Sequence, residues 1–177
     1  LALETNLEII PVLNKVDLPA SDPERVKSQI NDLIGLETDG INHVSGKTGE
    51  GVKDLLQKVI NFIPAPSGDI NAPLKVLLID AWYDSYLGVM VLVRVHDGVL
   101  KKGMKVILMK SKKEYQIEQV GTLDPKPKIV DSLSVGEVGF ITAAIKSVSD
   151  AWVGDTITDI KKPAYKALPG FKESVPV

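Results

Sequence analysis

Apolar residues recur with two different periods along this chain, and the period changes near residue 64. Before that point they are spaced three and four residues apart, as on one face of a helix. Beyond it they alternate with polar residues, as on one face of a strand. We therefore predict an α/β unit over residues 1–63 and an all-β unit over 74–160. A proline- and glycine-containing linker at 64–73 joins them.

Two strand–helix pairs are predicted in the α/β unit. Residues 7–13 form a continuous apolar strand. A helix follows that has its cap at Ser21-Asp22, Pro23 at its first position and its end at Gly35. A short strand at 41–44 leads into a second amphipathic helix over 52–63. This order is typical of a doubly wound α/β domain, of which we expect the chain to carry the last part.

The all-β unit shows strict alternation. One face of a strand carries Val89, Val91, Val93 and Val95, and Asp97-Gly98 closes that strand with a turn. Further strands are predicted at 105–109, 114–120, 138–143 and 156–158. Short strands separated by glycine-containing turns indicate a closed barrel of about six strands. Residues 161–177 are interpreted as a linker into a third domain.

Composition limits the chemistry. The 177 residues are 44% apolar and 25% charged, which is typical of a globular protein, and contain no cysteine, so disulfides and thiolate chemistry are excluded. The only two histidines, His43 and His96, lie far apart in the sequence, and we predict no metal site. No apolar run is long enough for a membrane-spanning helix. Because the chain begins at Leu1, we interpret it as a fragment.

The net charge of −2 hides a segregation. Residues 1–63 carry six basic and ten acidic residues, whereas residues 98–128 carry eight lysines and three acids. The second region is a candidate surface for an anionic partner. The alternative is a solvated edge that discourages strand pairing. The lysines expected to contact the partner are Lys101, Lys102, Lys105, Lys110, Lys112 and Lys113.

The run Asn14-Lys15-Val16-Asp17, directly after the first predicted strand, has the chemistry of a guanine site. A carboxylate such as Asp17 can accept from the N1–H and N2–H₂ groups of guanine together, whereas adenine offers no such pair of donors. Asn14 can donate to N7 while tying neighbouring loops together. Lys15 can lay its methylene groups over the base.

A second loop, Ser45-Gly46-Lys47, follows the second predicted strand. Its small residues let a backbone N–H reach the guanine O6. We predict that Asn14, Lys15, Asp17 and this loop bind guanine together. The alternative is an ordinary strand–helix turn with an aspartate cap and a solvated lysine. No phosphate-binding loop is present in the sequence, and no residue is predicted to be catalytic.

A guanine motif followed by a barrel is the domain order of translational GTPases. Three stretches resemble the LepA family (elongation factor four): Asp80-Ala81-Trp82-Tyr83-Asp84-Ser85-Tyr86-Leu87-Gly88, the run from Val95 to Gly103, and Leu168-Pro169-Gly170-Phe171-Lys172-Glu173. The implied fold is the C-terminal part of a P-loop GTPase domain, an α/β remnant, followed by an all-β elongation-factor-type barrel. The trio Trp82, Tyr83 and Tyr86 is expected to pack the barrel against its neighbours, with RNA base stacking as the alternative.

The resemblance implies a ribosome-dependent GTPase that promotes back-translocation, with GTP or GDP and Mg²⁺ in the parent protein and small-subunit ribosomal RNA as partner. It also implies a cytoplasmic protein, with peripheral attachment to the bacterial cell membrane, or a mitochondrial matrix protein if organellar. Gly46 stands where the family usually has alanine, and Ala81 where it has serine. We expect the fragment alone to bind no nucleotide and to be inactive. The competing hypothesis is a stand-alone ribosomal-RNA-binding barrel.

Overall fold

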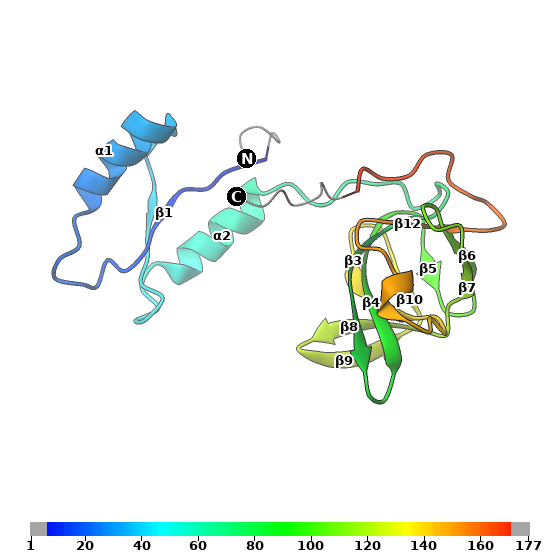
Figure 1. Cartoon of the computed structure of the whole chain (residues 1–177). Helices are drawn as coiled ribbons and strands as arrows, with labels where there is room; N and C mark the ends of the chain where they lie inside the picture. The colour runs from blue at the N-terminus through cyan, green and yellow to red at the C-terminus, as the bar shows by residue number, and fades with distance from the viewer. Residues whose placement is uncertain (1–6, 171–177) are drawn as a thin grey trace. The chain divides into compact units, whose positions relative to one another are not determined.

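The chain divides into two compact units, Leu1–Ala65 and Pro66–Val177, in a computed structural model that describes residues 7–170 (Figure 1). The first is a short α/β unit and the second an all-β barrel, which confirms the predicted fold class. Within the described residues, no helix has the length and apolar character needed to cross a membrane.

The first unit contains two strand–helix pairs. Its elements are β1 (Val12–Leu13), α1 (Pro23–Ile34), β2 (Asn42–His43) and α2 (Val52–Phe62). The two strands pair in parallel, with Val12 opposite Asn42 and Leu13 opposite His43. Parallel strands need a crossover between them, and α1 supplies it.

Both helices follow their sequence signals. The Asp22 side chain accepts a hydrogen bond from the Arg25 N–H at 3.1 Å, and Pro23 occupies the first turn of α1. Gly35 ends the helix in the left-handed region, with φ of 72°. The second helix begins after Gly51 and ends at Phe62, within one residue of the prediction.

The predicted strand at 7–13 is wrong in its extent, because only Val12–Leu13 pairs. Among the described residues β1 has one neighbour, β2, and that strand is itself two residues long. Pro11 also lacks the N–H that a ladder requires. The unit buries little: neither helix has a fully buried residue, and Leu33, on the predicted apolar stripe of α1, is 82% exposed.

The described part of the second unit contains ten strands. The long hairpin β3 (Lys75–Asp84) and β4 (Gly88–Asp97) is followed by β5 (Leu100–Lys101), β6 (Lys105–Leu108), β7 (Glu114–Gln116), β8 (Gln119–Asp124), β9 (Lys126–Val130), β10 (Ser132–Leu133), β11 (Val138–Thr142), a 3₁₀ turn η1 (Val148–Asp150) and β12 (Thr156–Asp159). Eight strands form one sheet in the order β7-β6-β12-β3-β4-β11-β8-β9, and β5 pairs with β10.

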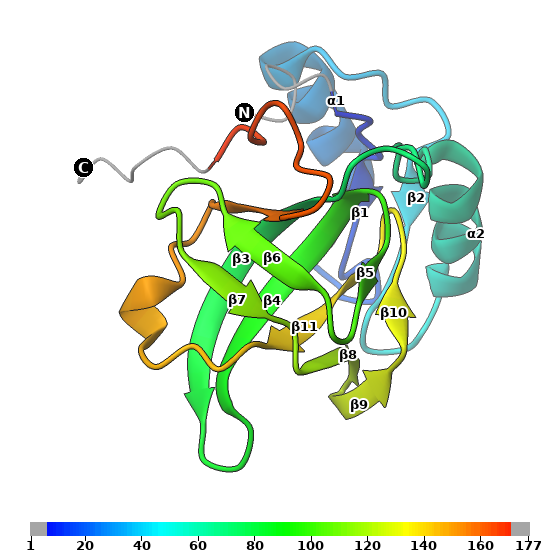
Figure 2. The ribbon, with the colours of Figure 1, turned by 90° about the vertical axis from the view of Figure 1, so that its right-hand side faces the viewer.

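One segment closes the sheet into a barrel (Figure 2). Glu114 to Gln116 pair with β6 at one end of the sheet, and Gln119 to Gly121 pair with β11 near the other. Between them the N–H of Ile117 donates to Met104 O at 2.9 Å and that of Glu118 to Thr142 O at 2.8 Å. The predicted single strand at 114–120 is therefore two strands, because the segment changes partner at Ile117.

The barrel holds the hydrophobic core. Eighteen buried residues form one cluster that runs from Leu74 to Ile157, and Val91, Val93 and Val95 of the predicted alternating face are all completely buried. Since none of this cluster comes from the first unit, the barrel has its own core.

The segment predicted as a linker is bonded to the barrel from Asp69 on. The Asp69 N–H donates to Asp97 Oδ1 at 3.0 Å, and the Gly98 N–H donates to Asp69 O at 2.9 Å. Lys75 Nζ lies 3.0 Å from Asp97 Oδ2. The hydrogen bond from the Asp69 N–H and, to a smaller extent, the contact with Lys75 hold the pKa of the Asp97 carboxyl below its ordinary value. The entry to the barrel is thus fixed to the end of β4.

Candidate functional site

The two predicted guanine-binding loops meet at the carboxyl ends of β1 and β2. The Val44 N–H donates to Leu13 O at 2.8 Å, and the Val16 N–H donates to Val44 O at 3.3 Å. These backbone bonds extend the contact between the strands into the loops. Asn14 and Ser45 leave the sheet at the same edge, where ligands of α/β sheets bind.

Asn14 joins the two loops directly. Its Oδ1 accepts from the Gly46 N–H at 3.2 Å and from the Lys15 N–H at 2.7 Å. Among residues 7–170 only the oxygen of the amide is used, so the Nδ2 group keeps both of its donors there. Lys15 has a φ of 65°, in the left-handed region that non-glycine residues adopt infrequently.

Ser45 is fully buried and organises its own turn. Its N–H donates to Glu50 O at 3.0 Å, and its Oγ accepts from the Thr48 N–H at 3.1 Å. The N–H of Gly46 is engaged by Asn14, as described above. Within residues 7–170, the Lys47 N–H donates to no protein acceptor, and it is the donor of this loop that a ligand carbonyl can use.

Asp17 lies in the turn that follows Asn14 and is half-buried. The Leu18 N–H donates to Lys15 O at 3.2 Å and closes that turn. No hydrogen bond or ion pair of the described residues involves the Asp17 carboxylate, so both oxygens remain open as acceptors.

These residues do not share one enclosed cavity. A hollow of about 360 Å³ opens at the end of β1, lined by Asn14 and Lys15 and by the start of α1. Neither Asp17 nor the Ser45-Gly46-Lys47 loop lines it. The open acceptors of Asp17 and the open N–H of Lys47 therefore lie outside this hollow.

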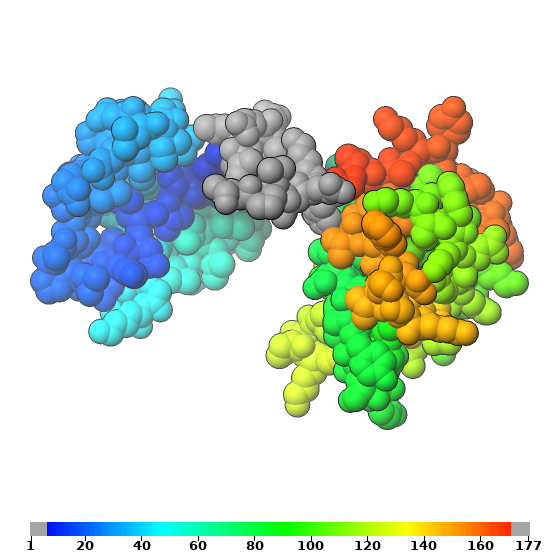
Figure 3. Space-filling model, in the orientation of Figure 1, coloured from blue at the N-terminus to red at the C-terminus, as the bar shows by residue number. Residues whose placement is uncertain are grey.

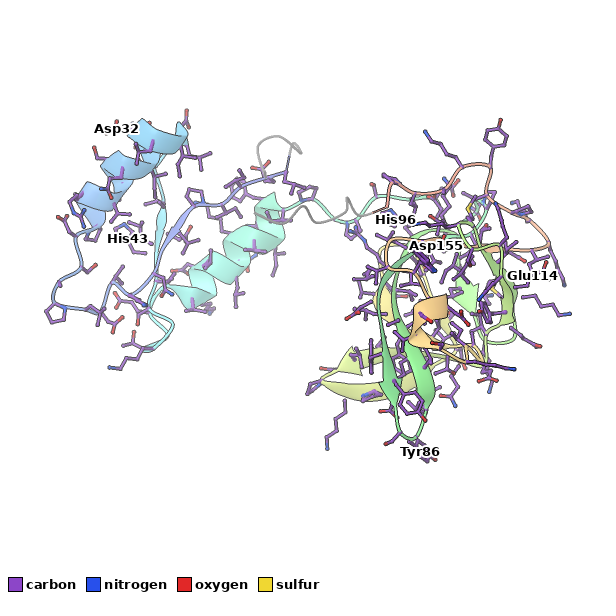
Figure 4. The ribbon with its side chains drawn as sticks, in the orientation of Figure 1. Asp32, His43, Tyr86, His96, Glu114 and Asp155 are labelled. Atoms are coloured by element: carbon purple, nitrogen blue, oxygen red, sulfur yellow. The ribbon has the colours of Figure 1, made fainter. Side chains whose placement is uncertain are left out.

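In the second unit the β3–β4 hairpin protrudes, as the green atoms of Figure 3 show, and Figure 4 labels Tyr86 at its tip. Tyr83 is 70% exposed and Tyr86 is 91% exposed, whereas Trp82 is partly buried. Within the described residues the two tyrosines are therefore not packed, and packing of the trio against a neighbour of the barrel stays a prediction. Asp84 shapes the tip by accepting from the N–H groups of Tyr86 and Leu87, both at 2.8 Å, and these bonds lower its pKa.

The six lysines predicted to contact an anionic partner separate into two places. Lys110, Lys112 and Lys113 lie around the turn from β6 to β7, where Lys113 Nζ is 2.6 Å from Asp150 Oδ1. Lys110 Nζ lies 4.4 Å from the ring centroid of Trp152. By contrast Lys101, Lys102 and Lys105 line a separate hollow at the start of β6.

Two residues that matter to these surfaces escaped the sequence analysis. Lys161, beyond the predicted barrel, lines the same hollow as Lys101, Lys102 and Lys105. Asp155 is buried and accepts from the N–H groups of Lys110 and Thr156 at 2.9 and 2.7 Å. Only the pairing of β6 with β12 brings either residue to this side, and the sequence carries no signal for that register.

Among residues 7–170, no three His, Asp or Glu side chains gather as metal ligands. His43 and His96 belong to different units.

Comparison with known families gives two matches. Residues 1–65 match the model of the elongation factor Tu GTP binding domain, and residues 88–158 match that of elongation factor Tu domain 2. The first match covers the α/β unit and its loops. The second covers the barrel from β4 to β12.

Proposed function

Because the chain belongs to the translational GTPases, with part of a GTP-binding domain followed by domain 2, we propose that its parent protein is a ribosome-dependent GTPase of the LepA type. In this proposal the α/β unit recognises the guanine of GTP or GDP, and the barrel faces the ribosome. The function of the parent is back-translocation of the elongating ribosome.

Guanine recognition is supported chiefly by the bond from Gly46 N–H to Asn14 Oδ1, which links two loops 32 residues apart. With the Asn14 amide fixed, its free Nδ2 can donate to N7 of the base. The open carboxylate of Asp17 would accept from N1–H and N2–H₂, and the Lys47 N–H would donate to O6. The stem of Lys15 would cover the face of the base.

The residues described fit the base and not the phosphates. No cluster of carboxylates among them could hold Mg²⁺. In the parent, Mg²⁺ would neutralise phosphate charge, and it would be held by the phosphate-binding part of the GTP-binding domain. This chain's own contribution is the orientation and selection of the nucleobase.

The test of guanine recognition is Asp17→Asn in the parent protein. Asparagine keeps one acceptor oxygen and replaces the other with an NH₂ group, which would face N2–H₂ or N1–H of guanine donor against donor and repel it. Loss of two charge-assisted bonds, worth about 3–6 kcal/mol together, should weaken GTP binding by roughly 10²–10⁴-fold. Asp39→Asn, an exposed site in the same unit, is the matched control and should leave affinity unchanged. Equal affinity of the two variants for GTP would contradict the assignment of Asp17 to guanine recognition.

The LepA type is supported by the stretch Trp82-Tyr83-Asp84-Ser85-Tyr86, which forms the tip of the β3–β4 hairpin. The decisive assay adds the parent protein and GTP to ribosomes in the post-translocation state and follows the position of the messenger RNA. Backward movement is expected. Forward movement, or delivery of aminoacyl-tRNA, would assign the protein to another branch of the family.

A second candidate function is a ribosomal-RNA-binding barrel with no role for nucleotide. The exposed lysines of the barrel favour it. It predicts that the parent binds ribosomes equally well with GTP, with GDP and without nucleotide, and that ribosomes do not stimulate GTP hydrolysis.

For localisation, we propose the cytoplasm, with peripheral attachment to the cell membrane in a bacterium, or the mitochondrial matrix for an organellar protein. Cell fractionation with ribosome pelleting tests this. Recovery only in an integral-membrane fraction would contradict it.

A further inference from the structure

The second unit has a concave basic surface, which we call the basic hollow. It measures about 560 Å³ and is lined by Lys101, Lys102, Gly103, Met104, Lys105, Asp159 and Lys161. Its four lysines are all exposed, and none takes part in an ion pair among residues 7–170. With one carboxylate against four ammonium groups, the hollow carries a local charge of +3.

Backbone hydrogen bonds fix the elements that carry these lysines. Asp159 at the end of β12 pairs with Val106 of β6. The Ile160 N–H donates to Lys105 O at 3.1 Å, so Lys161 follows directly beside the start of β6. The turn between β5 and β6, which carries Lys101 and Lys102, is closed by the Met104 N–H, which donates to Lys101 O at 3.4 Å.

That turn is also tied to the closing segment of the barrel, because the Gly103 N–H donates to Ile117 O at 2.8 Å. Two segments distant in sequence, 101–105 and 159–161, thus place their cations around one concavity. Little backbone entropy remains to be lost when an anion binds there.

Acidic residues limit the direction from which an anion can approach. Asp159 Oδ1 accepts from the Lys161 N–H at 2.9 Å, which keeps this carboxylate close to its own backbone. Glu114 shares with Lys105 a neighbouring hollow on the β7 side, and Figure 4 labels this glutamate. Lys102 also shares a neighbouring hollow with Glu114 and Glu118. An anion is therefore attracted more strongly to Lys101 and Lys161 than to the two lysines that adjoin these glutamates.

The lysines of the β6–β7 turn are engaged differently. Asp150 pairs with Lys113, and the ring of Trp152 lies under Lys110. An anion binding at this turn would have to compete with both contacts. At the basic hollow it would displace only water and counterions.

We propose that the basic hollow, rather than the β6–β7 turn, is the surface by which this chain holds the phosphate backbone of RNA. The inference rests on the proposed function, which makes the ribosome the partner. Lysines act as point charges on phosphates, and no aromatic side chain or amide lines the hollow to select a base. Binding there is independent of base sequence and strongly dependent on salt.

The test measures binding of the full 177-residue chain to purified small ribosomal subunits and to a mixed-sequence RNA duplex over a series of salt concentrations. The double variant Lys102→Gln/Lys161→Gln should weaken binding at low salt. It should also reduce the slope of log affinity against log salt by about one unit for each lysine removed. The matched control is Lys126→Gln/Lys128→Gln, which removes the same charge from exposed positions of β9 outside the hollow.

The hollow assignment predicts that the control pair keeps the slope of the original chain. Lys102→Arg/Lys161→Arg should also keep it, which excludes a folding defect as the cause. Equal slopes for the hollow pair and the control pair would overturn the proposal. Equal binding of poly-glutamate would also overturn it, because the surface would then fit an acidic protein.

This outcome is separable from the proposed function. If ribosomes stimulate GTP hydrolysis by the parent but the hollow variants keep full affinity and slope, the hollow assignment fails and the function stands. If the hollow variants lose RNA binding but ribosomes do not stimulate hydrolysis, the enzymatic function fails and the RNA surface stands.

Discussion

Two glycines, Gly46 in the second guanine-binding loop and Gly51 at the start of α2, illustrate how differently one residue type can be constrained. A Cβ added at Gly51 would lie 2.1 Å from the His43 carbonyl oxygen, and the residue has a φ of 67°. At Gly46 the nearest atom to such a Cβ, Asn14 Oδ1, lies 3.9 Å away, and φ is not in the left-handed region. Only Gly51 is therefore required by the backbone.

We predict that Gly51→Ala destabilises the first unit by at least about 1–2 kcal/mol, through left-handed strain and the clash with His43 O. Gly46→Ala should change its stability by less than about 0.5 kcal/mol. Hydrogen exchange of the Val44 and Ser45 amides, both bonded in this loop, measures the effect. Similar exchange rates in the two variants would contradict the prediction.

At this scale the sequence predicted chemistry better than geometry. The role of Asn14 in tying the loops follows from its motif, and the structure contains that contact. Which N–H is engaged and which is open does not follow, because the Gly46 and Lys47 amides are equivalent in the sequence. Their difference depends on the turn around Ser45, which is set by its bonds to Glu50 and Thr48.

Among the elements, the turn from β6 to β7 depends on one buried acid. Asp155 accepts from the backbone N–H groups of Lys110, Ser111 and Thr156, at 2.9, 3.4 and 2.7 Å. These donors belong to two segments 45 residues apart. Removing the carboxylate leaves buried N–H groups without a partner.

We predict that Asp155→Ala lowers the free energy of unfolding of the barrel by about 1–3 kcal/mol. Asp150→Ala, which removes only the partly exposed pair with Lys113, should cost no more than about 1 kcal/mol. Urea unfolding monitored by tryptophan fluorescence compares them. A larger loss for Asp150→Ala would show that the ion pair, not the buried acceptor, holds the turn.

The stability that the Asp97 carboxylate gives the barrel, through its contacts with the Asp69 N–H and Lys75, should be sensitive to acid. The folded-state pKa of Asp97 is below its ordinary value of 3.8, because the charged form accepts from Asp69 N–H and Lys75. Its stabilisation is therefore complete above about pH 4 and is lost as pH falls through the lowered pKa. Asp97→Asn should destabilise the barrel at pH 7, and the difference should shrink in strong acid.

Unfolding curves of Asp97→Asn from pH 2 to 7 measure this dependence, with the exposed Asp124→Asn on β8 as control. A difference that stays constant over this range would exclude the carboxylate as its source.

Elements with local signals were predictable, whereas elements that depend on partners were less so. The first helix carries caps in the sequence and the second an amphipathic period, and their observed bounds agree with the prediction to within one residue. The strand at 7–13 was overestimated because apolar residues do not show whether a neighbouring strand is present. The sequence analysis did not predict β3, although β3 and β4 are the longest strands. Asp80 and a bulge between Leu78 and Asp80 interrupt the alternation of apolar and polar residues along β3.

For the whole molecule, burial is divided unevenly between the two units. The core cluster lies wholly in the barrel, and the first unit buries only Leu13, Ile41 and Val44 among its described apolar residues. Large apolar side chains of α2 such as Ile60 and Phe62 are 73% and 60% exposed. Each unit has its own energetics, because stability follows the apolar area removed from water.

We predict that the barrel is the more stable unit of the isolated chain. Its amides, from about Leu74 to Ile160, should exchange with solvent more slowly than those of residues 7–63. Hydrogen exchange read by mass spectrometry resolves the two ranges. Slower exchange in the first unit would contradict the prediction and would mean that its exposed apolar faces are covered in solution.

The last prediction concerns nucleotide. We expect the 177-residue chain alone to bind GTP no more tightly than millimolar and not to hydrolyse it. The two charge-assisted bonds of Asp17 offer roughly 3–6 kcal/mol, whereas association costs an estimated 4–15 kcal/mol or more. Millimolar affinity already requires about 4 kcal/mol of net gain.

The described loops offer no phosphate contacts that would offset the free-energy cost of association. Gly40 stands one residue too far from Gly46-Lys47-Thr48 to complete a phosphate-loop motif. The N–H of Gly46 is directed to Asn14 and that of Thr48 to Ser45 Oγ, so they do not converge on an anion. Calorimetry of the chain with GTP and Mg²⁺ is the measurement. A dissociation constant in the micromolar range would show that residues 40–48 open to receive phosphate, and it would move the nucleotide site from the base edge to this loop.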